Sequence, residues 1–161
     1  MGRAPLVFAD ASICIHVQES RTQARANAID TLSSTATSAE IPILEFSPNP
    51  YVLFENSVDK VVGRVRGLNR HTILIFGQWL ESAITQTAVY FLLEGFDVFI
   101  VSDNCYSRKP AFEAIYLQRL HSIGVTITTL QQVIFELMWQ DENEETVEEL
   151  LKHSEAVAAR E

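Results

Sequence analysis

The chain has 161 residues, of which 47% are hydrophobic, and a formal net charge of −9. This length is enough for one globular domain with a buried core, so we expect residues 1–161 to form a single domain. The negative charge argues against nucleic acid or an anionic membrane as the main partner.

Targeting and redox features indicate a soluble protein. No apolar run reaches the length of a membrane-spanning helix, and the first residues lack the apolar core of a signal peptide. Cys14 and Cys105 have neither metal-ligand nor disulfide-framework spacing, which favours a reducing compartment. We therefore expect a cytoplasmic location.

The first part of the chain predicts strands and helices in alternation. Three short apolar runs predict strands: Pro5–Asp10, which ends in a carboxylate, Ile41–Phe46, and Tyr51–Phe54 at a sheet edge. The helical spacing of apolar residues predicts helices over Glu19–Thr37 and from Asn56 to Gly67.

The middle of the chain predicts a βαβ unit, around which the other elements are organised. Thr72–Gly77 and Phe96–Asp103 are apolar runs typical of parallel strands that are buried on both faces. The helix between them ends at Gly95. Its apolar stripe consists of Leu80, Ala83, Ile84, Thr87, Ala88, Phe91 and Leu92.

The last part of the chain predicts one more strand and three helices. These elements are a helix from Pro110 to Gly124, a strand over Val125–Thr129, a helix over Leu130–Trp139, and a C-terminal helical extension in residues 141–161. The apolar side of the extension, within Val147–Val157, needs a surface to cover it. The alternation predicts an α/β fold: a three-layer α/β/α sandwich with a mostly parallel sheet of five to six strands.

The turn that follows the Thr72–Gly77 strand is the first candidate site, because ligands bind at the carboxyl ends of parallel strands. Backbone N–H groups at the start of the next helix can hold an anion or an oxyanion. Asp10, at the predicted end of the first strand, would lie on the same edge as a general base, although a capping role is the favoured alternative. Ser82 is adjacent to the buried stripe residue Ala83 and is therefore expected to point away from the pocket.

Neither a cofactor nor a metal is expected. No glycine-rich loop follows the first predicted strand, which argues against a nucleotide site. The four histidines, His16, His71, His121 and His153, have no paired spacing typical of metal ligands. Cys14 and Cys105 are expected to be small core residues.

Four stretches together give the chain a resemblance to a known family. They are the strand that ends in Asp10, Ile73–Gly77 with a six-residue turn into a helix, Glu94–Asp103, and Asn104–Arg108 ahead of Gly124–Thr129. In this order and spacing the chain resembles the isochorismatase-like cysteine hydrolases, and in particular the isochorismatase-domain-containing subgroup, up to about Glu145. The resemblance implies the Rossmann-like hydrolase fold of that family and a cis peptide bond between Gln78 and Trp79.

The resemblance also implies where catalytic residues should stand. Active members use a Cys nucleophile, an Asp base and a Lys, and the matching positions here are Ala83, Asp10 and Tyr51. The family's oxyanion hole corresponds to Gln78, Trp79, Leu80 and Ala83. An alanine cannot attack a substrate, and a phenol with a pKa of about 10 does not replace an ammonium group. Ser47–Pro50 stands where the family has a longer substrate-contacting segment.

Three hypotheses follow for the function. The leading one is a catalytically inactive member of the family that acts as a binding or scaffold subunit for a small-molecule ligand, so the sequence leans against an enzyme. The second is an active hydrolase of small amides with relocated machinery, built on Asp10 with Ser82, Cys14 or Cys105. The third is a purely structural relative. We also expect a homo-oligomer, because the family commonly assembles in this way.

Overall fold

The structure is a computed structural model that describes residues 6–18, 26–47 and 54–159. Its sheet has five strands, all parallel, in the order β2-β1-β3-β4-β5. The strands are β1 (Ser12–Val17), β2 (Ile43–Phe46), β3 (Thr72–Gln78), β4 (Asp97–Tyr106) and β5 (Thr126–Thr128). The predicted parallel α/β sheet is confirmed.

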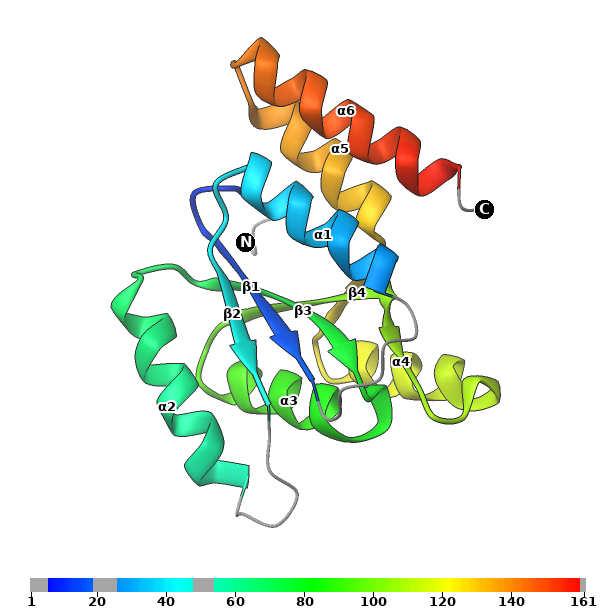
Figure 1. The fold of residues 1–161 in the computed structure, drawn as a ribbon. Helices are drawn as coiled ribbons and strands as arrows, with labels where there is room; N and C mark the ends of the chain where they lie inside the picture. Colours follow the sequence, from blue (N-terminus) through cyan, green and yellow to red (C-terminus); the bar gives the residue numbers. More distant parts are fainter. Residues whose placement is uncertain (1–5, 19–25, 48–53, 160–161) are drawn as a thin grey trace.

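Helices cover both faces of the sheet and give three layers (Figure 1). On one side lie α1 (Ala26–Ser38), α5 (Leu130–Gln140) and α6 (Glu144–Ala158). On the other side lie α2 (Phe54–Gly67), α3 (Thr85–Leu93) and α4 (Glu113–Ser122). Two short turns precede helices: the π-helical η1 (Leu80–Ile84) before α3, and the 3₁₀ turn η2 (Pro110–Phe112) before α4. In the part of the chain that the structure describes, no helix is long and apolar enough to cross a membrane.

The two central strands have the burial that parallel sheets require. Every residue of β1 and of β3 is buried. Helices on both faces exclude water from strands of this kind, which therefore need apolar side chains in both directions. The predicted βαβ unit is confirmed, and β4 continues beyond the predicted Asp103 to Tyr106.

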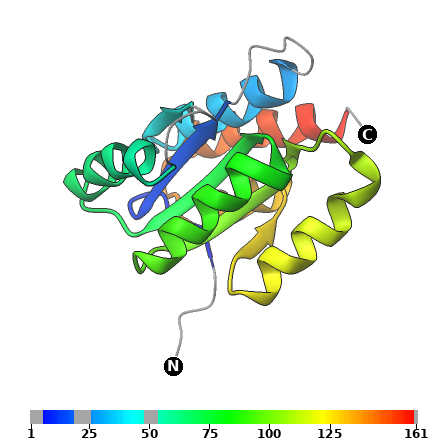
Figure 2. The same ribbon diagram turned by 90° about the horizontal axis from the view of Figure 1, so that it is seen from below.

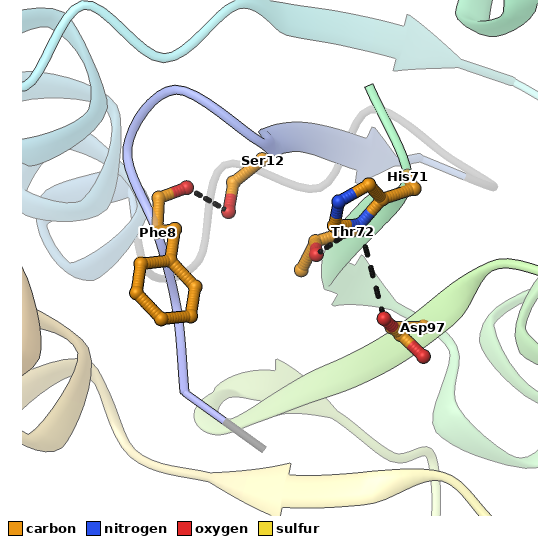
Figure 3. Close-up of polar contacts among 5 residues, drawn as sticks. All are labelled: Phe8, Ser12, His71, Thr72 and Asp97. Atoms are coloured by element: carbon orange, nitrogen blue, oxygen red, sulfur yellow. Dashed lines mark hydrogen bonds and ion pairs between the residues drawn. The ribbon is translucent and has the colours of Figure 1, made fainter. Parts of the chain in front are cut away.

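The first strand was predicted in the wrong place. It was expected over Pro5–Asp10, but β1 begins at Ser12, and Asp10 lies in the turn ahead of it. The polar residues of β1 are accommodated in the sheet. Ser12 Oγ donates a hydrogen bond to the Phe8 carbonyl at 2.6 Å (Figure 3), and the His16 ring stacks on Phe76.

The expected edge strand Tyr51–Phe54 is also corrected, because Phe54 is the first residue of α2. The rest of that segment, including Tyr51, lies outside the described residues. Other elements are present with shifted ends: α1 begins at Ala26, and β2 begins at Ile43 rather than Ile41.

The C-terminal helix packs on its own chain. α6 lies against α5 and α1, with Leu150, Ser154 and Val157 buried. His153 Nε2 lies 3.2 Å from Ser38 Oγ at the end of α1. The apolar side of α6 is thus covered within the chain, so it gives no argument for a partner.

Candidate functional site

The turn after β3 has an unusual backbone. The peptide bond between Gln78 and Trp79 is cis, which confirms the expectation from the resemblance. Gly77 has a φ of +119°, and a Cβ atom there would lie 2.0 Å from the Val17 carbonyl oxygen of β1. Only glycine allows the end of β3 to lie this close to β1 with this backbone conformation.

The chain then enters the π turn that holds Ala83. The N–H groups of Ser82 and Ile84 both donate to the Trp79 carbonyl at 3.1 Å. Ala83 is 3% exposed, and its carbonyl accepts a hydrogen bond from Thr87 Oγ1 at 2.6 Å. Ala83, which the resemblance predicts at the position of the family nucleophile, is therefore a buried methyl group.

Neither thiol is suited to replace that nucleophile. Cys14 and Cys105 are both buried and unpaired. Burial raises the pKa of Cys14 to about 12. Burial also raises the pKa of Cys105, with Asp103 adding to the effect, and its Sγ donates to the Ile75 carbonyl at 3.6 Å. Since only the thiolate is an effective nucleophile, both groups are held in the unreactive form at neutral pH.

Asp10 does not join the turn, so its expected place at this edge is wrong. Asp10 is exposed and precedes β1, next to Ala11, whose carbonyl accepts from the N–H groups of His71 and Thr72. These contacts put Asp10 at the amino ends of the strands, where Figure 3 shows His71, Thr72 and Asp97 together. The seven residues of β3 separate this end from the Trp79 turn by about 20 Å.

His16 is the titratable residue that β1 does bring to the carboxyl end, and sequence reasoning missed it. It is opposite Phe76 in the register, and the two rings stack with centroids 4.8 Å apart. His16 Nδ1 lies 3.7 Å from Glu45 Oε1. Burial lowers the pKa of His16, and Glu45 opposes that effect. The signal was present in the alternation of Ile13, Ile15 and Val17, which makes His16 part of a strand.

A second polar cluster joins the π turn to the end of β4. Glu81 Oε1 accepts a hydrogen bond from the Arg108 N–H at 3.1 Å, and the Arg108 guanidinium lies 5.1 Å from the centre of the Trp79 ring. Asn104 is buried, and its Nδ2 donates to Asp103 Oδ1 at 3.2 Å. The same Asp103 oxygen accepts from Leu130 N–H at the start of α5.

Four buried side-chain atoms have no hydrogen-bond partner among the residues that the structure describes: His16 Nε2, Trp79 Nε1, Glu81 Oε2 and Asn104 Oδ1. All four belong to the carboxyl half of β1, the turn after β3, or the end of β4. Unpaired buried polar atoms are few in native proteins because each costs free energy. Their concentration makes this edge the first candidate for a site that binds a polar molecule.

The same edge offers no metal centre in residues 6–18, 26–47 and 54–159, where no group of three His, Cys, Asp or Glu side chains could hold an ion. Tyr51, which the resemblance predicts at the position of the family lysine, lies outside the described residues. Ala83, Gln78, Trp79 and Leu80 do lie together in the turn after β3.

Comparisons with known proteins agree with this geometry. A family model of the isochorismatase domain matches residues 51–132, just over half of the chain. Isochorismatase domain-containing protein 1 of Danio rerio is 33% identical over 72 residues, which cover 45% of this chain and 25% of that protein. The chain thus aligns with only a quarter of the length of this relative.

Solved structures extend the similarity over nearly the whole fold. YcaC from Escherichia coli, described as an octameric hydrolase of unknown specificity, has a TM-score of 0.80 at 15% identity, over 96% of this chain and 93% of that chain. YcaC from Pseudomonas aeruginosa, solved with hexane-2,5-diol and covalent acrylamide, has a TM-score of 0.81 at 15% identity, over 99% and 96% of the two chains.

Proposed function

Because the chain belongs to the isochorismatase family, we propose that it is a catalytically inactive member that binds a small molecule at the carboxyl edge of its sheet. The observation that carries this proposal is Ala83, a buried methyl group at the position that matches the nucleophile. The two buried thiols support it, since neither is reactive at neutral pH. They also suit a reducing compartment such as the cytoplasm.

The unpaired polar atoms favour a binding role over a purely structural one. A fold kept only for its shape gains nothing from burying His16 Nε2 and Asn104 Oδ1 with no hydrogen-bond partner among the described residues. A bound polar molecule supplies those partners. The alternative is a hydrolase with relocated catalytic residues. It is less well supported, because Asp10 lies at the opposite edge of the sheet and burial raises the pKa of both cysteine thiols.

Assays with small amides test the loss of catalysis. We expect the purified protein to hydrolyse nicotinamide and simple amides no faster than buffer. We also expect Ala83→Cys to remain inactive, because burial would raise the pKa of a thiol at this position above its usual value of about 8.5. Mass spectrometry after addition of an activated ester would reveal a covalent acyl-enzyme. Turnover by the unmodified protein would overturn the proposal.

We further propose that the chain self-associates through an apolar patch, which we call the α5 patch and define by Phe135 and Trp139 of α5 together with Leu6 from the segment ahead of β1. Phe135 and Trp139 are one helical turn apart, and Trp139 is 79% exposed. The segment that carries Leu6 is attached to α5, because Val7 N–H donates to Glu136 Oε2 and Gln140 Nε2 donates to the Val7 carbonyl. An exposed apolar patch of this kind is typical of a protein interface.

A further inference from the structure

A groove is lined by residues of η1, α3 and α4. Figure 2 shows α3 and α4 on the face of the sheet opposite to α1, α5 and α6. The volume of the groove is about 200 Å³. Most of its wall is apolar, and its apolar lining residues are Val89, Tyr116, Leu120 and Ile123. The remaining lining residues are Thr85 at the start of α3 and two charged residues, Glu81 from the π turn and Arg119 from α4.

Only one of the two carboxylate oxygens of Glu81 accepts a hydrogen bond from the described residues. Its Oε1 accepts from Arg108 N–H, but its Oε2 is buried and has no partner among the described residues. No cation of the described chain forms an ion pair with this carboxylate. A buried carboxylate oxygen without a donor is costly, and charge-assisted hydrogen bonds are the strong ones that repay such a cost.

Arg119, which also lines the groove, needs no hydrogen-bond partner from a ligand. It is exposed, so water can accept hydrogen bonds from its guanidinium group. The group in this groove that lacks a partner is therefore the Glu81 carboxylate, which needs an N–H donor. The π-helical turn that presents Glu81 is itself a feature found frequently at functional sites.

We propose that the α3–α4 groove binds a small organic cation, whose apolar body lies against Val89 and Leu120 and whose N–H donors bind Glu81. The volume is suitable, because an apolar cavity of about 150 Å³ holds benzene, and this groove has room for one ring with a small head group. This site does not depend on a ligand at the carboxyl edge, although Glu81 and Ala83 belong to the same turn.

Three probes of nearly equal shape test the class of ligand: benzamidine is a cation with N–H donors, benzamide is neutral, and benzoate is an anion. Calorimetric titration at physiological salt should show benzamidine binding at least about tenfold more tightly than either of the others, since a hydrogen bond to a charged group contributes about 1.5–3 kcal/mol. Preference for benzamide or benzoate would overturn the cationic class. Binding of none of the three at millimolar concentration would also overturn it.

Matched variants locate the binding. Glu81→Gln should weaken benzamidine at least about tenfold, whereas Glu148→Gln, which removes the same charge from the exposed face of α6, should leave it unchanged. Val89→Phe fills the groove and should abolish binding, whereas Leu93→Phe, at an exposed site one turn further along α3, should not. If Glu81→Gln does not fold, the comparison of Val89→Phe with Leu93→Phe still tests whether benzamidine binds in the groove. Unchanged affinity in Val89→Phe contradicts the groove and leaves the proposal for the carboxyl edge intact.

Discussion

Gly77 sets the geometry of the candidate site through a missing side chain. Its positive φ and its closeness to the Val17 carbonyl leave no room for a Cβ atom. We expect Gly77→Ala to lower the free energy of unfolding by about 3 kcal/mol or more, from strain and a backbone clash together. Urea denaturation measures this loss.

Gly63 supplies the control for that substitution. It lies inside α2, and a methyl group added to its Cα would meet no other atom within 4 Å. Gly63→Ala should stabilise the protein by about 0.5–1 kcal/mol, because alanine is the better helix former. Equal effects of the two substitutions would contradict the role assigned to Gly77.

His16 makes stability depend on pH. Because burial lowers its pKa in the folded state, the unfolded chain binds the proton more readily. The folded state should therefore lose stability as the pH falls below the unfolded value of about 6.5. His16→Phe keeps a ring next to Phe76 and should make thermal unfolding less sensitive to pH between about 7 and 5.

The exposed His121 on α4 serves as the reference for that experiment. His121→Phe should retain the pH dependence of the parent protein. An identical slope in His16→Phe and in the parent would rule out His16 as its source.

Single residues also explain where sequence reasoning failed. The run Ser12–Val17 mixes polar and β-branched residues, and its polar members are buried through contacts with Phe8 and Phe76 that are not local pattern features. The neighbouring run that ends in Asp10 looked more apolar, yet it does not enter the sheet. Ala83 was placed correctly in the turn because the spacing from Gly77 is local.

At the scale of elements, α6 is held by a few buried side chains. Leu150 is fully buried against the rest of the chain, whereas the adjacent Leu151 is 43% exposed. Leu150→Ala should lower the free energy of unfolding by about 2–5 kcal/mol, as for other buried leucines. Leu151→Ala, which makes the same chemical change on the outer side, should cost well under about 1 kcal/mol. Denaturant unfolding of both variants checks the difference, and similar losses would show that α6 is not docked as described.

The elements differed in how far the sequence could predict them. β3, α3 and β4 were predicted closely because long apolar runs alternate with one amphipathic helix. The end of β4, from Asn104 to Tyr106, lies beyond the predicted Asp103: Cys105 and Tyr106 pair with Gly77 and Gln78 of β3 after a shift in the register. Those partners are far away in sequence, so no local pattern reports them.

At the scale of the whole molecule, the order of the strands decides which residues can act together. β1 lies between β2 and β3, which brings His16, Glu45 and the Gly77 turn to one edge and leaves Asp10 at the other. The register of a parallel sheet cannot be read from any one strand. Because the first strand was predicted to end at Asp10 and in fact begins at Ser12, Asp10 was expected at the opposite end of the strands from where it lies.

Self-association is the last property that the whole molecule makes testable. Light scattering at micromolar concentration should give a mass that is a multiple of one chain. Trp139→Glu should shift the equilibrium toward the monomer, because a buried interface tryptophan contributes about 2 kcal/mol or more and a carboxylate cannot be buried there without a partner. Leu93→Glu, an equally exposed change on α3 at 80% exposure, should leave the mass unchanged. A monomer mass for the parent protein would exclude self-association, and a Trp139→Glu variant that stays oligomeric would exclude the α5 patch as its surface.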